Sequence, residues 1–142
     1  MANVKFKPFG ILGGMGPLAT TLLLNDIQLL ATKQYGCSRT PDYPEMEIQS
    51  IPAREPWVSG VKEEKTIEDI RKGVSKLNDS YLKGNIYFYV MASNTAYCYK
   101  KALDSFQIPL LDLHQLVEEE IKQRKNKFYF VMGTVNLKES GL

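Results

Sequence analysis

Apolar positions along the chain fall into short β-branched or aromatic runs that alternate with longer segments of helical periodicity. In the longer segments, leucine and isoleucine recur with the spacing of a helix that has one apolar face. The short runs have the length and composition of buried strands. The pattern predicts strands at Val4–Leu12, Met46–Ile51 and residues 85–93, 108–113 and 127–134, and helices at residues 17–35, 66–82, 94–106 and 114–125.

This alternation of strands and helices indicates the fold class. Apolar strands separated by helices favour an α/β fold, in which a parallel sheet is flanked by helices on both faces. Ligands of such sheets lie beyond the carboxyl ends of the strands. Four turns that follow predicted strands are therefore candidate binding segments, and each is rich in Gly, Ser, Thr, Asn or Arg: residues 13–17, 51–57, 92–95 and 133–135.

Two of the predicted helices carry a local start signal. Pro17 suits the first position of a helix, because the N–H that proline lacks would have no helical partner there. Thr66, with Asp69 three residues later, is a variant of the capping box. The sequence therefore predicts that the second long helix is capped by Thr66.

Composition narrows the class of protein. The chain has 142 residues, which fits one ordinary domain, and its net charge of +2 gives no electrostatic footprint for nucleic acid or an anionic membrane. We find no apolar stretch of membrane-span length and no signal-peptide pattern, and we expect a cytoplasmic protein. Cys37 and Cys98 are far apart and not in a metal-ligand spacing. They form one disulfide or two reduced thiols, and the second alternative is favoured.

The first candidate turn lies in the stretch "FGILGGMGPLAT", residues 9–20, which holds four glycines and a proline. So many glycines indicate a tight turn or a close approach of the main chain to a phosphate, a carboxylate or a neighbouring helix. Residues 14–19 formally fit the G-x-G-x-x-A dinucleotide fingerprint. However, Pro17 removes an N–H that a phosphate would use, and no acidic residue ends the second strand. Close helix–strand packing alone would also explain the glycines.

The third candidate turn lies in "VMASNTAY", where Ser93 ends a strand and Asn94 and Thr95 open a helix. An amide, a hydroxyl and the N–H groups of a helix start together make a cradle for a carboxylate. The alternative is that Ser93 or Asn94 only caps the helix.

These two turns carry a resemblance to a known family. "GILGGMGPLAT" followed by "M-x-x-N-T-A" resembles the aspartate/glutamate racemase family, and "IPLLDL" and "VMGTVNLKESGL" are similar to further segments of it. The resemblance implies a cofactor-independent racemase of acidic amino acids, built from two similar α/β domains with the active site between them. One cysteine from each domain faces the substrate α-carbon, so that a thiolate removes the α-proton and a thiol donates a proton to the opposite side.

The resemblance also assigns residues. It places Ser93 where the family has its first catalytic cysteine, and Ser50 where the family has an arginine that grips a carboxylate. Arg54, which aligns with a later arginine of the same loop, is a candidate carboxylate ligand. Trp57 is a candidate lid residue or a core residue. The substrate-binding residues implied are Met15, Gly16, Arg54, Asn94, Thr95 and Thr134, with no metal ligand and no cofactor.

The same resemblance gives the expected organisation and function. Residues 1–126 match the family's N-terminal domain and residues 127–142 the opening strand and tail of a second domain, and the chain ends before the segment with the second cysteine. We therefore expect a truncated racemase with weak or no activity alone. The alternatives are a non-catalytic carboxylate-binding or oligomerisation module, and a nonfunctional remnant that still folds. The expected partners are a small carboxylate or amino acid and a second copy in a homodimer, with no nucleic acid and no membrane.

Overall fold

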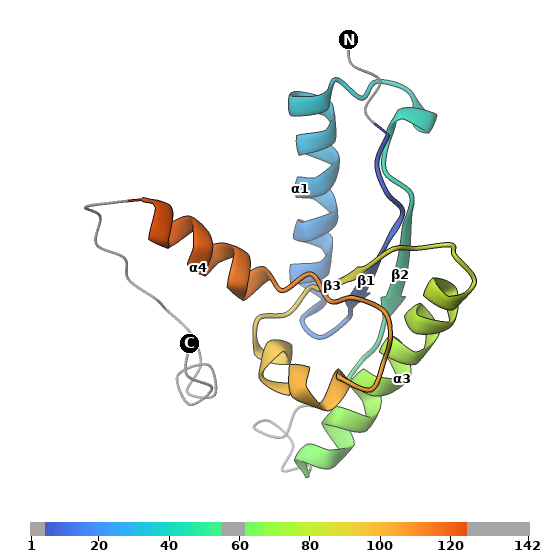
Figure 1. Ribbon diagram of the computed structural model, residues 1–142, viewed down its shortest axis with the longest axis vertical. Helices are drawn as coiled ribbons and strands as arrows, with labels where there is room; N and C mark the ends of the chain where they lie inside the picture. The colour runs from blue at the N-terminus through green and yellow to red at the C-terminus, as the bar shows by residue number, and fades with distance from the viewer. Residues whose placement is uncertain (1–4, 55–61, 125–142) are drawn as a thin grey trace.

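The computed structural model describes residues 5–54 and 62–124, and its centre is a three-stranded parallel sheet (Figure 1). The strands are β1 (Phe9–Gly13), β2 (Met46–Ser50) and β3 (Tyr89–Met91). Their order is β2-β1-β3, with β1 in the middle and parallel to both neighbours. The predicted fold class, a parallel sheet flanked by helices, is confirmed.

Helices cover both faces of this sheet. The α-helices are α1 (Pro17–Tyr35), α3 (Glu63–Leu82) and α4 (Leu113–Gln123), and two 3-10 helices are η1 (Thr40–Asp42) and η2 (Thr95–Leu103). Figure 1 shows α1 on one side of the strands and α3 and η2 on the other, while α4 projects away from the sheet. Pro17 is the first residue of α1, as predicted.

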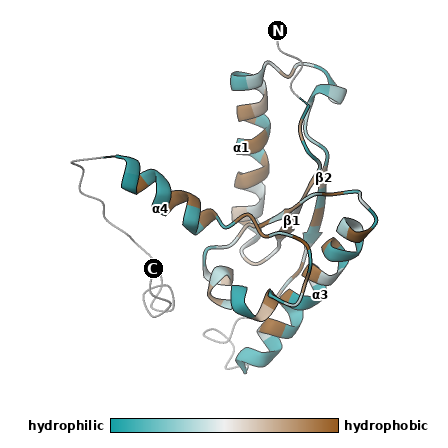
Figure 2. Ribbon diagram, viewed as in Figure 1, coloured by the Kyte–Doolittle hydropathy of each residue, from teal (hydrophilic) through white to brown (hydrophobic). Residues whose placement is uncertain are grey.

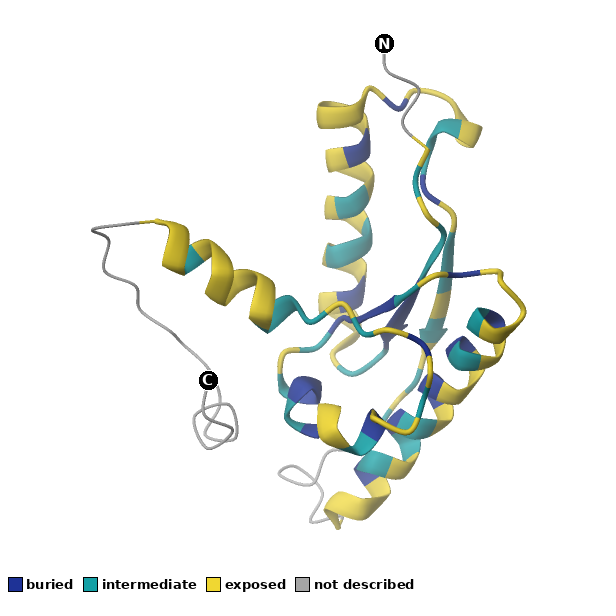
Figure 3. Cartoon of the chain, in the orientation of Figure 1, coloured by how far each residue is buried: buried dark blue, intermediate teal, exposed yellow. Residues whose placement is uncertain are grey.

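Two apolar clusters hold the layers together, because neighbouring side chains of a strand point to opposite faces. Leu12 and Met91 belong to the cluster beneath α3 and η2, whereas Ile11 and Val90 belong to the cluster beneath α1. The helices differ in how far they are buried. Figure 3 shows buried residues along α3, but α4 buries no residue, and apolar positions remain on its surface in Figure 2.

Strand boundaries differ from those predicted, mainly at the amino ends. The first strand begins at Phe9 rather than Val4, so Pro8 precedes it, and the third is confined to Tyr89–Met91. The segment 108–113 forms one isolated bridge, between Leu110 and Tyr89, instead of a strand. Pro109 explains this difference, because proline has no N–H to donate to a ladder. Its carbonyl accepts from the Tyr89 N–H at 2.9 Å.

The predicted cap at Thr66 is wrong. Helix α3 begins three residues earlier, at Glu63, and Thr66 is a buried residue inside it. Its hydroxyl donates instead to the carbonyl oxygen of Arg54 at 2.6 Å. A tertiary hydrogen bond therefore replaces the local one that the capping pattern suggested.

The predicted helices at 94–106 and 114–125 exist, but with changed form or bounds. Residues Thr95–Leu103 form a 3-10 helix rather than an α-helix. Helix α4 runs from Leu113 to Gln123, and Asp112 caps it by accepting from the N–H groups of His114 and Gln115 at 3.0 and 3.3 Å.

Several predicted features need separate mention. Cys37 and Cys98 form no disulfide, which confirms the reduced alternative. Within the described segments, every helix is too short or too polar to cross a membrane. Trp57, Thr134, and residues 127–142, with the strand and the second-domain opening predicted there, lie outside the described residues.

Candidate functional site

The carboxyl ends of the three strands lie side by side and form the floor of the candidate site. Gly13 of β1 pairs with Ser50 of β2, and Leu12 pairs with Met91 of β3. The same ladder continues into the turns, because the Ile51 N–H donates to Gly13 O at 2.9 Å and the Ala92 N–H to Leu12 O at 2.8 Å. The first three candidate turns therefore meet at one edge of the sheet.

Close packing accounts for two glycines of the first turn. A Cβ at Gly13 would lie 2.5 Å from the Thr20 side chain, and one at Gly14 would lie 2.5 Å from the backbone nitrogen of Ile51. The Gly14 N–H already donates to Thr20 Oγ1 at 3.0 Å, so a phosphate has one fewer donor here. This bond adds to the case against a dinucleotide site.

Gly16 has a different role. It precedes α1 with a φ of 86°, and a Cβ there would have almost open surroundings. A left-handed backbone therefore favours glycine at this position, without any crowding.

A small cavity lies where these turns meet. It is lined by Met15, Ala53, Arg54, Thr66, Ile70, Ser93, Thr95, Ala96 and Tyr99 and has a volume of about 30 Å³. This volume is about the share of one water molecule in the liquid. The cavity brings together four of the predicted site residues, Met15, Arg54, Ser93 and Thr95. Gly16 and Asn94 adjoin lining residues but are exposed and do not line the cavity themselves.

The third turn presents two hydroxyl groups to this cavity. Ser93 Oγ and Thr95 Oγ1 are 3.3 Å apart and both residues are half-buried. Asn94 occupies the cap position of η2, but its side chain makes no capping hydrogen bond with the described residues. The alternative prediction, that the Asn94 side chain only caps this helix, is therefore wrong.

Arg54 is held firmly by α3. Its Nε and Nη2 donate to the two carboxylate oxygens of Asp69 at 2.7 and 2.8 Å, and its backbone N–H donates to Asp69 Oδ2 at 3.2 Å. The guanidinium hydrogen bonds lower the pKa of Asp69 below its usual value, and the same contact raises the pKa of Arg54. Both groups are thus charged at neutral pH, with Arg54 fixed at the rim of the cavity.

The chain's one histidine packs against a buried tyrosine. The ring centres of His114 and Tyr97 are 4.4 Å apart, and burial lowers the pKa of His114. His114 is not among the residues that line the cavity. It therefore gives no support for a base at Ser93.

Sequence patterns missed part of the cavity wall. Tyr99 and Ile70 carried no signal beyond ordinary apolar periodicity. Thr66 and Asp69 did carry one, the three-residue spacing of a capping box, but both side chains interact with Arg54 instead.

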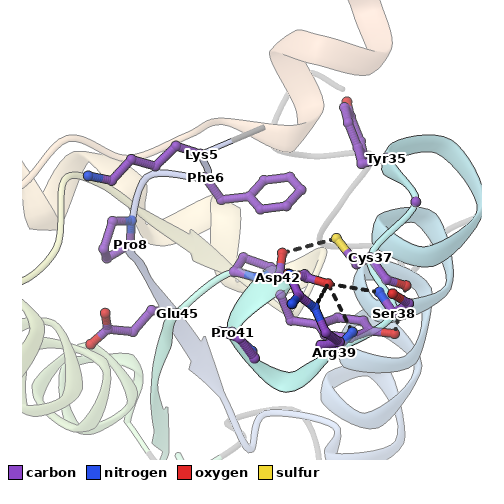
Figure 4. Close-up of a pocket in the computed structure, with 13 residues that line it drawn as sticks. Lys5, Phe6, Pro8, Tyr35, Cys37, Ser38, Arg39, Pro41, Asp42 and Glu45 are labelled. Atoms are coloured by element: carbon purple, nitrogen blue, oxygen red, sulfur yellow. Dashed lines mark hydrogen bonds and ion pairs between the residues drawn. The ribbon is translucent and has the colours of Figure 1, made fainter. Parts of the chain in front are cut away.

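A much larger cavity, of about 800 Å³, lies near the opposite end of the sheet (Figure 4). Several of its polar groups bond to one another. The Cys37 thiol donates to Asp42 O at 3.0 Å, and the backbone N–H groups of Ser38 and Arg39 both donate to the Asp42 carboxylate. Arg39 Nη2 lies 3.2 Å from the same carboxylate. These bonds shape the loop itself, so the small cavity at the carboxyl edge remains the better candidate site.

Comparison with known proteins adds sequence evidence. No family model matches the chain. The chain is similar to the broad specificity amino-acid racemase RacX of Bacillus subtilis, with 31% identity over 128 residues that cover 88% of this chain and 53% of the relative.

Solved structures share the fold at lower identity. The aspartate racemase of Picrophilus torridus matches with a TM-score of 0.79 and 20% identity over 96% of this chain and 56% of its own. An aspartate racemase homologue from Pyrococcus horikoshii matches with a TM-score of 0.65 and 20% identity, over 84% of this chain and 50% of its own. The chain thus spans about half the length of the relatives it matches.

Proposed function

We propose that this chain, which is related to the aspartate/glutamate racemase family, carries one half of an amino-acid racemase site at the carboxyl edge of its sheet. One observation carries the proposal: Met15, Arg54, Ser93 and Thr95, from three separate turns, line one cavity. Hydroxyl groups and a guanidinium suit the α-carboxylate of an amino acid. Gly16, Asn94 and Thr134 belong to the proposed site by resemblance, and no cofactor is required.

The chemistry proposed for this half-site is α-proton transfer on an acidic amino acid, with Ser93 at the position of the acid–base group. A serine hydroxyl is a poor base unless a neighbouring base activates it. Among the described residues, the hydrogen-bond partner of Ser93 Oγ is another hydroxyl, that of Thr95 at 3.3 Å. We therefore expect the chain to bind the substrate but to exchange its α-proton slowly or not at all.

The described residues form only part of the wall of the proposed site. A cavity of about 30 Å³ is too small for an amino acid, so a further surface must complete it. We infer a homodimer in which a second copy supplies this surface. Exposed leucines support association: Leu18, Leu22 and Leu29 recur along α1 at intervals of four and seven residues and are 70%, 54% and 42% exposed.

Deuterium exchange tests the catalytic half of the proposal. The full chain is incubated with L- or D-aspartate in D₂O, and loss of the α-proton signal is followed by NMR. We expect wild type to stay near the buffer rate and Ser93→Cys to exceed it by about 10²-fold, the lower range for one general base. One thiol faces one side of the α-carbon, so a single enantiomer should react faster.

Ser93→Ala is the matched control and should show no exchange. Aspartate binding by calorimetry without exchange in any variant would favour the alternative, a non-catalytic carboxylate-binding module. Absence of both binding and exchange would overturn the proposed function. For the homodimer, light scattering at micromolar concentration should give twice the chain mass, and a monomer would contradict the dimer.

A further inference from the structure

Helix α3 makes more hydrogen bonds to Arg54 than an ordinary ion pair would. In the first two turns of α3, the Asp69 carboxylate accepts hydrogen bonds from the guanidinium and from the backbone N–H of Arg54. The Thr66 hydroxyl donates to the Arg54 carbonyl. The carbonyl of Lys65 accepts a further bond from Nη2 at 3.3 Å. We infer that Asp69 and Thr66 are positioning residues for Arg54 in carboxylate recognition. This inference rests on the proposed function.

Donor counting over the bonds to the described residues indicates which part of Arg54 can bind a ligand. A guanidinium has five N–H groups, of which Nε carries one and Nη2 two. Nε donates to Asp69 Oδ2, and Nη2 donates to Asp69 Oδ1 and to Lys65 O. The bonds to α3 therefore use the Nε and Nη2 donors, and the two Nη1 donors are assigned to the ligand carboxylate.

Burial suits this division of roles. Thr66 is 3% exposed, and the Asp69 side chain is 18% exposed, whereas the Arg54 side chain is 38% exposed. The holding groups are thus less exposed than the guanidinium, which stays within reach of a ligand at the cavity rim. A fixed guanidinium loses less conformational entropy when it binds a carboxylate, which raises affinity.

The chain offers a matched control at the other end of its sheet. Arg39 and Asp42 make the same kind of pair, but they are three residues apart and the Arg39 side chain is 79% exposed. Loss of this pair removes an arginine–carboxylate contact without touching the small cavity, which Arg39 and Asp42 do not line.

Affinity for L-aspartate, measured by calorimetry on the full chain, tests the inference. We expect Asp69→Asn to weaken binding about tenfold, the effect of one charge-assisted hydrogen bond. Asp69→Glu, which keeps the carboxylate, should recover most of the affinity. Arg54→Lys should bind as weakly as Asp69→Asn, because lysine lacks the planar fork. Asp42→Asn should bind like wild type.

A second measurement separates this inference from the proposed function. Hydrogen exchange of the Arg54 Nε–H, followed by NMR without ligand, should be slow in wild type and in Asp42→Asn but fast in Asp69→Asn. Equal exchange in wild type and Asp69→Asn would overturn the positioning role, as would equal affinity for aspartate. A third outcome is that wild type does not bind aspartate, although Asp69→Asn still speeds exchange of the Arg54 Nε–H. This outcome would overturn the proposed function and the ligand role of Arg54, and would leave Arg54 with a structural role.

Discussion

The two ends of the sheet each hold an arginine–aspartate pair beside a cavity, yet they differ in how the pair is built. At the amino end, Arg39 and Asp42 belong to one short loop that folds on itself. At the carboxyl end, Arg54 and Asp69 are fifteen residues apart and join a turn after β2 to α3. The local pair shapes its own loop, whereas the distant pair fixes a side chain where three strand ends converge.

Volume and lining chemistry favour different cavities as the candidate site. The amino-end cavity has about 800 Å³ and the carboxyl-end cavity about 30 Å³. In the larger one, the Asp42 carboxylate accepts N–H groups of its own loop, and these bonds lower its pKa. In the smaller one, residues from three turns present hydroxyls and a guanidinium. The comparison teaches that convergence of distant segments is better evidence for a site than volume.

The largest effect expected from a single change is at the carboxyl end, in Gly14→Ala. Its Cβ would lie 2.5 Å from Ile51 N, at a φ of +87° that side chains rarely adopt. Overpacking and backbone strain together should lower the free energy of unfolding by about 2–5 kcal/mol, measured by urea denaturation. Gly84→Ala is the matched control: its φ is +77°, but a Cβ there has no atom within 4 Å. The control keeps the backbone strain but not the crowding, so an equal loss in the two variants would contradict the crowding argument.

A smaller effect is expected from removing one hydroxyl at each end. Tyr97 is 2% exposed, and its hydroxyl accepts from the Met91 and Leu113 N–H groups at 3.4 Å and donates to Leu111 O at 3.3 Å. Tyr97→Phe should therefore cost about 1–3 kcal/mol of unfolding free energy, because it leaves buried backbone groups unpaired.

Tyr43→Phe is the counterpart at the amino end. The Tyr43 hydroxyl lies 2.8 Å from Thr32 Oγ1 and 3.3 Å from Cys37 O, closer to solvent. Its loss should cost about 0.5–1 kcal/mol in the same denaturation experiment. A larger loss from Tyr43→Phe than from Tyr97→Phe would reverse the comparison between the two ends.

The fold could be predicted from local patterns because the central strands and helices have strong periodicity. Ile11 and Leu12 face opposite apolar clusters, as expected of a strand buried on both faces. Pro17 fixed the start of α1 for a local steric reason. The predicted helix and strand boundaries were wrong where long-range contacts determine the structure. Thr66 is an example, because its hydroxyl donates to the carbonyl of a residue twelve positions earlier.

The candidate site could be predicted only in part. Met15, Ser93 and Thr95 follow strands, and parallel strands bring such turns to one edge. The partner of Arg54 could not be deduced, because no local pattern links a loop arginine to Asp69 in the next helix. Cavity walls such as Tyr99 depend on how η2 packs, and periodicity alone does not give that packing.

The two aspartates should also differ in the pH dependence of stability. Hydrogen bonds from Arg54 place the pKa of Asp69 below its ordinary 3.8. The stability from this pair is therefore present above about pH 4 and lost as the pH falls through the lowered folded pKa. Asp69→Asn should remove at most about 1 kcal/mol at pH 7, since the pair is partly screened by solvent. The difference from wild type should shrink towards pH 2, as measured by urea denaturation at several pH values.

Asp42→Asn should follow the same direction with a smaller change. The pKa of Asp42 is lowered chiefly by the Arg39 backbone N–H, a contact within three residues that a partly folded loop can keep. Interactions that persist after unfolding contribute little to stability. If Asp42→Asn removed as much stability as Asp69→Asn, the contrast between a local and a distant pair would be wrong.

The smallest expected effect concerns the two thiols, one at each end. Cys37 is 4% exposed and its thiol donates to Asp42 O at 3.0 Å, whereas Cys98 in η2 is half-buried. Thiol reagents attack accessible thiolates, so at pH 8 one thiol per chain should react quickly and the second only as the chain opens. Cys98→Ser should abolish the fast phase and change stability by less than about 0.5 kcal/mol, while Cys37→Ser should keep that phase. A fast phase that persists in Cys98→Ser would mean that the amino-end loop opens readily. The internal bonds of this loop would then not make it more rigid than the carboxyl end.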